Sequence, residues 1–442
     1  MDEHRRGIGH RLGVTTALLL GFASFWPSSL TAQTTTGAIA GRVVDQQNLA
    51  LDGALIRVSS PNLQGIRTTT TSAAGDYLVP LLPPGLYSVT VEFAALQRHT
   101  STVLIASGRT SQVNVTLDVA PIAEQVSVGG TFTEVFTGTS QLATTFPQSL
   151  LSALPTNRTL DAALLLSPSV HPTGPFGAPS IAGAMSFESV FLVDGVVVND
   201  TIRGQPLALY IEDAVQETTV FTGGISAEYG RFAGGAANLI TRSGGNVFSG
   251  SFRDTLVNDR WRALTPFAGD TRTDNVISTP EFTLGGPVLR DRLWFFTAGR
   301  STNVEVGRTA LTVPYTFADT VHRYEGKVTY GVAAGHSISS TYVGIRQSTE
   351  NIGFSTAIDI RSLYDRQIPQ SLFALTYNGV LSPRLAIEGR LGSRRMAIEN
   401  EGARTRDLIE GTLLIDRARN RRYWSPTFCG ICDSDKRYND DV

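Results

Sequence analysis

Strict alternation of apolar and polar residues in the second half of the chain leaves few folds open to it. Tyr324, Val328 and Tyr330 alternate with Glu325 and Lys327, and the same period of two recurs at 373–378 and 385–391. A strand with this pattern has one apolar face and one polar face. No apolar run in this half reaches the ~20 residues of a membrane helix. If these residues enter a membrane, they must therefore do so as a β-barrel, with one face toward lipid and the other toward water.

The connections between these strands predict the same architecture. Short turns at 289–292, 333–335 and 381–384 alternate with long polar stretches at 258–280, 302–322, 347–369 and 400–436. Outer-membrane barrels join their strands by short periplasmic turns and longer external loops. We therefore expect about seven barrel strands within residues 246–442, with the long polar stretches forming the external loops.

The N-terminus has the order of a secretory signal. Arg5, Arg6 and Arg11 precede an apolar run at 12–26, and small residues follow at 28–32. This order predicts a signal peptide over residues 1–32, cleaved after Ala32. An uncleaved membrane anchor is the alternative, but about 15 apolar residues fall short of the ~20 that a span needs.

Composition and motifs argue against nucleic-acid binding and against catalysis. The formal net charge is -2, whereas phosphate contacts need a concentrated basic face. No HExxH, GxSxG or complete phosphate-loop motif occurs, and the histidines are scattered along the chain. We therefore expect no nucleic-acid partner, no enzyme activity, no metal site and no cofactor.

The only two cysteines, Cys429 and Cys432, lie in the last long polar stretch. A zinc site would need two further ligands, and no histidine is nearby in the sequence. A thioredoxin-like site would need a strand before the pair and a helix after it. A structural disulfide in an oxidising compartment is our preferred interpretation, with metal binding or redox chemistry as the alternatives.

Residues 36–118 contain about seven short strands separated by regular turn signals, which predicts a small β-sandwich. The strings Gly41–Asp45, Ser72–Tyr77 and Leu82–Tyr87 resemble the carboxypeptidase regulatory-like domain. This resemblance implies a transthyretin-like sandwich of the carbohydrate-binding-like group. A spacer role is favoured over sugar binding, because no cluster of exposed Trp or Tyr residues is evident that could stack on a sugar ring.

Residues 131–245 carry a second set of motifs. An apolar run at 191–193 enters an Asp-Gly turn, and glycine-rich strings follow at 227–231 and 234–245. In this order and spacing they resemble the plug domain of TonB-dependent outer-membrane receptors, in the Oar-like branch with a carboxypeptidase-like front domain. The plug-motif residues are Asp194, Gly195, Tyr229, Gly230, Gly234, Gly235, Asn238 and Thr241.

The string from Gly285 to Phe296 resembles the first barrel hairpin of the same receptors. The resemblance implies a mainly β fold: a signal peptide, a small transthyretin-like β-sandwich, a mixed α/β plug domain and the first strands of an antiparallel transmembrane β-barrel. Barrels of this family have about 22 strands, and residues 246–442 are too few to supply them at ~10 residues per strand plus loops. We therefore expect the sequence to be a fragment or a C-terminally truncated product.

Between the sandwich and the plug, residues 119–130 form a linker with a short β-prone stretch. This stretch resembles the TonB box, and a plain linker or a last sandwich strand is the alternative. Its five residues are candidates for contact with TonB by strand addition, which depends mainly on main-chain hydrogen bonds: Glu124, Gln125, Val126, Ser127 and Val128.

The resemblance implies an outer-membrane transporter for active uptake of a large or scarce substrate. Its implied partners are TonB of the inner-membrane energising complex, outer-membrane lipid and an unknown siderophore, cobalamin, glycan or peptide. A surface-associated structural or adhesive protein, with glycan binding through the sandwich as one form of it, is the second hypothesis. A secreted soluble enzyme is the third, and the alternating strands count against it.

Overall fold

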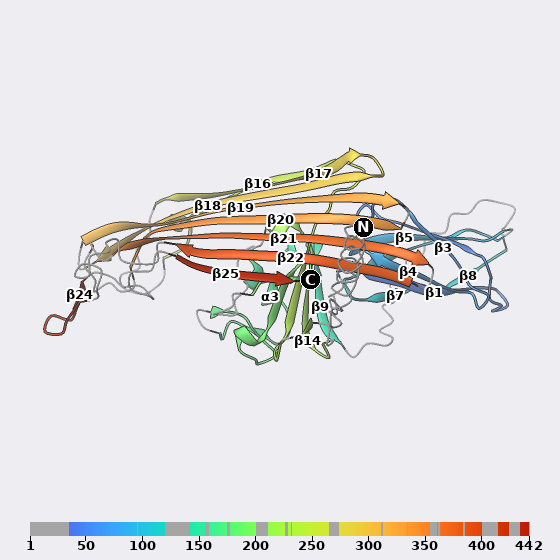
Figure 1. Cartoon of the computed structure of the whole chain (residues 1–442), viewed down its shortest axis with the longest axis horizontal. Helices are drawn as coiled ribbons and strands as arrows, with labels where there is room; N and C mark the ends of the chain where they lie inside the picture. Colours follow the sequence, from blue (N-terminus) through green and yellow to red (C-terminus); the bar gives the residue numbers. More distant parts are fainter. Residues whose placement is uncertain are drawn as a thin grey trace, which may run out of the picture.

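The computed structural model describes residues 35–94, 96–119, 141–154, 159–174, 177–199, 211–225, 229–230, 232–264, 274–310, 313–333, 335–353, 360, 363–382, 385–399, 414–423 and 434–441. The signal peptide, the TonB-contact candidates and both cysteines lie outside the described residues. Three bodies follow one another along the chain (Figure 1). A long curved sheet carries a smaller sheet against one side, and a sandwich stands at one end of the long sheet.

The sandwich consists of two sheets that enclose one apolar core. One sheet joins β1 (Gly37–Asp45) to β4 (Asp76–Leu82), β7 (Thr110–Gln112) and β8 (Val115–Leu117). The other has the order β3 (Arg67–Thr70), β2 (Leu55–Ser59), β5 (Gly85–Glu92) and β6 (His99–Ile105). Alternate residues of β5 face inward, because side chains of a strand point to opposite faces in turn. The core therefore combines residues of both sheets: Ile39, Val43, Ile56, Val58, Tyr87, Val89 and Val91.

The plug is built on a five-stranded mixed sheet in the order β13-β12-β15-β14-β9. Its strands are β9 (Leu142–Pro147), β12 (Val190–Val193), β13 (Val196–Val197), β14 (Val215–Gly223) and β15 (Ala236–Thr241). Two short helices, α2 (Gln148–Leu151) and α3 (Leu160–Leu164), follow β9, and β10 (Val170–His171) pairs with β11 (Ser180–Ile181). The remaining elements are the 3-10 turns η2 (Ser186–Glu188) and η3 (Glu212–Ala214). Both β12 and β15 are buried along their whole length, as expected of strands covered on two faces.

The long sheet has eight antiparallel strands in the order β16-β17-β18-β19-β20-β21-β22-β25. Seven of them run consecutively: β16 (Ser249–Asn258), β17 (Val276–Leu289), β18 (Leu293–Ala310), β19 (Val313–Ala333), β20 (His336–Ile352), β21 (Tyr364–Ser382) and β22 (Leu385–Glu399). The 3-10 turn η5 (Asp259–Trp261) follows β16, and β23 (Leu414–Asp416) pairs with β24 (Arg421–Tyr423). The eighth strand, β25 (Ser434–Asp441), pairs with β22. The expected mainly β fold class is confirmed, with the barrel not closed by these strands.

Two of the expected external loops are largely strand. The stretch 302–322 lies almost wholly inside β18 and β19, which pair from Leu293 to Ala310, and most of 347–369 belongs to β20 and β21. The prediction failed because polarity was used to separate loop from strand. Two polar strands that leave the membrane together still satisfy each other's backbone groups, so the hairpin can continue into water.

Outward-facing and inward-facing residues of the long sheet differ as a membrane wall requires. Outward positions are exposed and apolar, as at Phe282, Val328, Phe373 and Leu391. Inward positions include a set of buried polar side chains: Glu281, Thr283, Glu325, Lys327, Thr329, Thr341, Thr376, Arg390 and Arg394. Separately, no helix in the described parts of the chain is long and apolar enough to cross a membrane.

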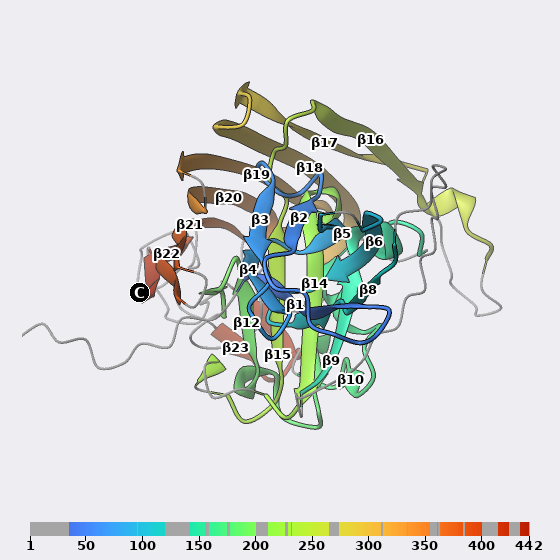
Figure 2. The same cartoon turned by 90° about the vertical axis from the view of Figure 1, so that its right-hand side faces the viewer.

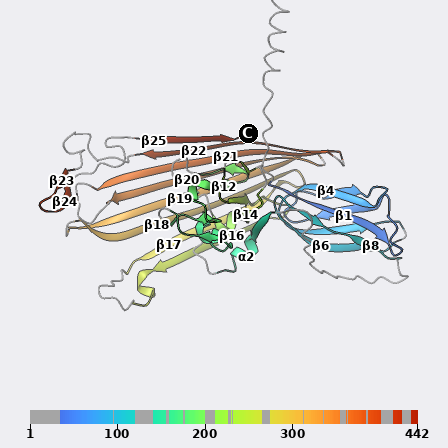
Figure 3. The same ribbon diagram turned by 90° about the horizontal axis from the view of Figure 1, so that it is seen from below.

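The three short turns, which join β17 to β18, β19 to β20 and β21 to β22, lie at one end of the long sheet, and the sandwich stands beyond that end (Figures 1 and 3). The plug sheet lies against the inner face of the long sheet (Figure 2). Since short turns mark the periplasmic side of such barrels, the sandwich is on the periplasmic side of the plug.

Candidate functional site: the junction of the plug and the barrel wall

The Asp-Gly turn expected from the sequence joins β12 to β13. Asp194 has φ 48° and Gly195 has φ 76°, so both central residues are left-handed, as in a two-residue type I′ hairpin. Val193 pairs with Val196 across this turn. A Cβ on Gly195 would also overlap the guanidinium of Arg390 on barrel strand β22. Glycine is therefore favoured here by backbone conformation, and the terminal guanidinium of Arg390 would have to move to admit a Cβ.

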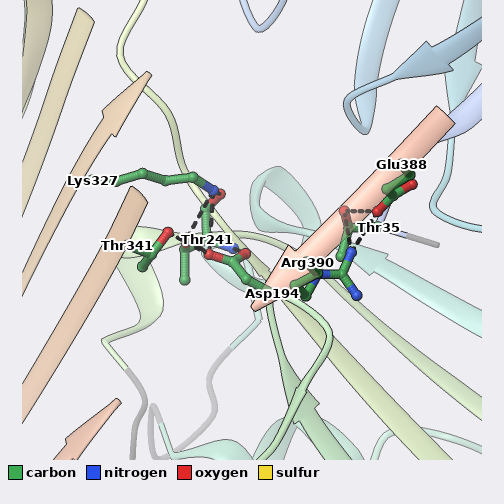
Figure 4. Close-up of polar contacts among 7 residues, drawn as sticks. All are labelled: Thr35, Asp194, Thr241, Lys327, Thr341, Glu388 and Arg390. Carbon is green, nitrogen blue, oxygen red and sulfur yellow. Dashed lines mark hydrogen bonds and ion pairs between the residues drawn. The ribbon is translucent and has the colours of Figure 1, made fainter. Parts of the chain in front are cut away.

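The carboxylate of Asp194 is the centre of a buried polar cluster (Figure 4). Its Oδ1 accepts the backbone N–H of Thr241 at 2.9 Å, and its Oδ2 accepts the hydroxyl of Thr241 at 2.6 Å. Two barrel residues complete the set: the Thr341 hydroxyl donates to Oδ2 at 2.9 Å, and Lys327 Nζ lies 3.3 Å from the same oxygen. We call Asp194, Thr241, Lys327 and Thr341 the lock, because two come from the plug and two from the barrel wall.

The lock contains a largely buried charge pair at the edge of a polar cavity. Asp194 is 6% exposed and Lys327 is 8% exposed. Burial raises the pKa of Asp194. Lys327 and the hydrogen bonds from Thr241 and Thr341 lower that pKa by more than burial raises it, so the pKa of Asp194 is below its usual range. Lys327 Nζ also donates to the Thr241 carbonyl at 3.2 Å. Such a pair depends on both partners, because removal of one leaves the other charged and desolvated.

A second carboxyl lies on the same strand, two residues before Lys327. Glu325 is 6% exposed, and its Oε1 is buried with no hydrogen-bond partner among the described residues. It faces the same side of β19 as Lys327, since side chains alternate along a strand. Lys327 thus lies 3.3 Å from Asp194 and two residues from Glu325 on the same face of β19, so its loss should disturb both acids.

Other contacts hold the plug along the wall. Arg253 on β16 lies 3.4 Å from Asp213 and 3.9 Å from Glu212, both buried in η3. Arg394 on β22 donates to the Asn199 carbonyl at 2.7 Å. These contacts lie on opposite sides of the lock along the wall, so the plug is held at several separate strands.

An apolar layer seals the remaining contact. Phe191, Val193 and Val196 of the plug belong to one buried cluster with the barrel residues Val321, Val343, Ile345, Leu372 and Ala374. Gly392 on β22 provides room for it, because a Cβ there would overlap the Val196 side chain. The packing makes this part of the junction dry.

The structure brings together only some of the predicted plug-motif residues. Asp194, Gly195 and Thr241 meet at the lock, whereas the others serve the plug's own packing. Tyr229 packs on Phe221 with ring centroids 4.9 Å apart. The remaining four serve the plug as follows: Gly230 has φ 34°, Gly234 lies tightly against Ala184 and Ser189, Gly235 lies tightly against Ile181 of β11, and Asn238 is buried in β15 opposite Thr219.

Lys327 and Thr341 were not singled out by the sequence. Lys327 appears there only as one polar position in an alternating strand, and Thr341 has no distinguishing neighbours. The only signal for Lys327 in the sequence is its position between Glu325 and Thr329, on the face of the strand that meets the lumen. In the described residues, no group of three or more His, Cys, Asp or Glu side chains is placed to hold a metal ion.

Comparison with known proteins identifies the architecture. The carboxypeptidase regulatory-like domain model matches residues 38–118, and an outer membrane beta barrel domain model matches residues 240–321. The TonB-dependent transporter Oar of Myxococcus xanthus is 30% identical over 390 residues, which is 77% of this chain and 35% of that protein. In sequence and in architecture the chain is thus similar to the TonB-dependent receptors. It is an outer-membrane protein and spans about a third of the length of the curated relative it matches.

Two solved structures of outer-membrane transport proteins give partial matches, each with a TM-score below 0.5. The siderophore receptor PirA of Acinetobacter baumannii matches with a TM-score of 0.48 and 15% identity, over 67% of this chain and 43% of that one. The outer membrane transporter YddB of Escherichia coli matches with a TM-score of 0.49 and 15% identity, over 67% of this chain and 44% of that one.

Proposed function

We propose that the receptor carrying this chain is a TonB-dependent transporter, which takes up a large or scarce substrate across the outer membrane into the periplasm. The observation that carries the proposal is the lock, in which Asp194 and Thr241 of the plug are bound by Lys327 and Thr341 of the wall. A plug attached by a buried charge pair blocks the lumen at rest. External energy is then needed to move it, because a buried pair is costly to break.

TonB is the proposed energy source, through the stretch Glu124–Val128. This stretch precedes β9, which lies at one end of the plug sheet. A strand added by TonB there would be bound through main-chain hydrogen bonds and could act on the plug through its first strand.

Replacing Val126 by Pro tests this contact. Proline removes a backbone donor, so an added strand should lose a ladder hydrogen bond and TonB binding should fall. The measurement is photo-cross-linking to TonB from a reactive residue at position 125, in cells that express the intact receptor. Val126→Thr is the matched control, because threonine keeps the N–H and favours extended structure. Equal cross-linking in the two variants would remove this segment from the proposal.

The adhesive alternative with a glycan-binding sandwich receives no support from the described residues. The sandwich has three aromatic residues: Tyr77 and Tyr87 are buried, and Phe93 packs against the core. Each tyrosine donates its hydroxyl to a backbone carbonyl, of Val113 and Pro83 respectively. No aromatic ring is thus presented for stacking on a sugar, and a spacer or docking role for the sandwich remains our proposal.

A further inference from the structure

A polar cavity lies where the sandwich, the plug and the barrel wall meet. Its barrel side is formed by hydroxyl and amide side chains: Thr329, Ser337, Ser339, Thr341, Thr376 and Asn378. The strand register arranges most of them in rows across the wall. Thr329 pairs with Ser339, which pairs with Thr376, and Ser337 pairs with Asn378. One wall of the cavity is therefore wettable.

The character of the wall changes at the lock. The row through Lys327 and Thr341 continues to Ala374 and Gly392. The next row toward the outside joins Val343 to Leu372 in the dry seal, with Glu325 and Arg394 on either side of that pair. On the periplasmic side of the lock, the rows that line the cavity are polar. Opening of the lock would consequently connect the dry contact to a polar space that leads toward the short turns.

The sandwich covers that space on its periplasmic side. Pro83 and Pro84, with Asn62 and Arg67, line the cavity opposite the barrel wall. Tyr87 fixes the proline pair by donating its hydroxyl to the Pro83 carbonyl at 2.6 Å. The Leu82–Tyr87 string that marks the regulatory-like domain in the sequence therefore covers the cavity, and we call this string the roof.

Three contacts clamp the sandwich in this position. The Ser107 N–H donates to the buried carboxyl of Glu217 on β14 at 2.8 Å, and Arg109 donates to the Ala143 carbonyl on β9 at 3.1 Å. The third contact is with the barrel itself, where Arg390 donates to the Thr35 hydroxyl at 3.2 Å beside Glu388 (Figure 4). Two clamps therefore hold the plug, one on β14 and one on β9, and the third holds the wall.

We propose that this cavity is the periplasmic end of the transport path, and that the sandwich is a lid that must leave the plug before substrate can pass. The inference rests on the proposed transport function. It adds a second closed barrier in series with the lock. The linker that contains Glu124–Val128 joins the lid directly to the first plug strand, so one pull there acts on both barriers.

Cysteine accessibility in the intact receptor tests the lid without knowledge of the substrate. In a Cys429→Ser, Cys432→Ser background, Ser339→Cys places a thiol under the roof and Ala374→Cys places one in the dry seal. Each is labelled with a membrane-impermeant maleimide added to the periplasmic side of outer-membrane vesicles. The double replacement Arg109→Ala, Glu217→Ala removes the two clamps on the plug and leaves the Arg390–Thr35 contact with the wall in place.

With the clamps intact, the thiol at 339 should react slowly. Loss of two hydrogen bonds should open the lid more often and speed its labelling roughly tenfold or more, with the thiol at 374 still protected. Fast labelling at 339 with intact clamps, or an unchanged rate without them, would overturn the lid. So would equal acceleration at 374, because the clamps would then hold the whole plug against the wall.

Energised cells separate this inference from the transport proposal. If TonB moves the lid, labelling at 339 in cells with intact clamps should rise when the inner membrane is energised and not in a TonB-deficient strain. Acceleration by the clamp variant with no effect of TonB would support the lid and count against TonB-driven transport.

Discussion

Replacing Lys327 by Met should detach the plug from the wall more often, and the structure sets the size of the effect. Lys327 Nζ lies 3.3 Å from Asp194 Oδ2, and a unit pair at that distance interacts by about 5 kcal/mol at an effective dielectric constant of ~20. The cost of burying the ammonium offsets part of that attraction. The usual loss on removing one member of a buried pair is about 3–5 kcal/mol, and we expect about 3 kcal/mol because three hydrogen bonds to Asp194 remain.

Hydrogen exchange at the Thr241 amide measures this loss directly, because that N–H donates to Asp194 Oδ1. A 3 kcal/mol decrease in opening free energy speeds exchange by roughly 150-fold when closing outpaces exchange. Thr329→Val on the same strand is the matched control, and it should change exchange by less than about tenfold, because it removes no charge.

The double variant Asp194→Asn, Lys327→Met decides whether the charge pair is the cause. Removal of both charges should recover about half of the loss, since neither variant side chain then leaves a buried charge at the pair. Two results would refute the lock as the main attachment of the plug. One is a change of less than fivefold in Thr241 exchange in the Lys327→Met variant. The other is a loss of opening free energy in the double variant equal to the sum of the losses in the two single variants.

Two further predictions use other parts of the structure. Gly195→Ala should lower the stability of the plug by about 2–3 kcal/mol in chemical denaturation, because it adds a Cβ at positive φ and against Arg390. Gly183 also has positive φ but faces open space, so the control variant Gly183→Ala should cost about 1 kcal/mol. Burial raises the pKa of Glu217 to about 7, with Arg109 and a sandwich N–H partly offsetting it. The folded state should therefore be most stable below pH ~4.5 and should lose about 3 kcal/mol as the pH rises to about 7. Chemical denaturation against pH measures this loss, and a Glu217→Gln variant should show a flatter profile.

The sequence predicts the local parts of this fold well, because their signals are local. The Asp194-Gly195 turn follows from two residue types that tolerate positive φ, and the barrel strands follow from a period of two. Thr241 was also marked, but its contact with Asp194 arises from the parallel pairing of β12 with β15, which the sequence does not encode within any short window.

The remaining parts of the site depend on contacts between separate bodies. Lys327 could be placed on the polar face of a strand, yet only the three-dimensional arrangement shows that Asp194 lies opposite it. The Leu82–Tyr87 string marks the regulatory-like domain in the sequence but does not show that its prolines cover the cavity, because a proline turn has the same sequence whether it faces solvent or another domain. The extended hairpins and β25 were missed for a related reason, since polar strands resemble loops.

The order of strands in the plug has a mechanical consequence. A force applied to the N-terminal end of β9 breaks its pairing with β14 one residue pair at a time, starting from Leu142 and Gly223. The strands are therefore unzipped and not sheared. The lock is borne on the turn after β12, beyond β14 and β15 in the sheet. A modest force can therefore separate β9 from β14 while β12 stays attached to the wall through the lock. The plug would then unfold in stages and would refold onto the strands that remain attached.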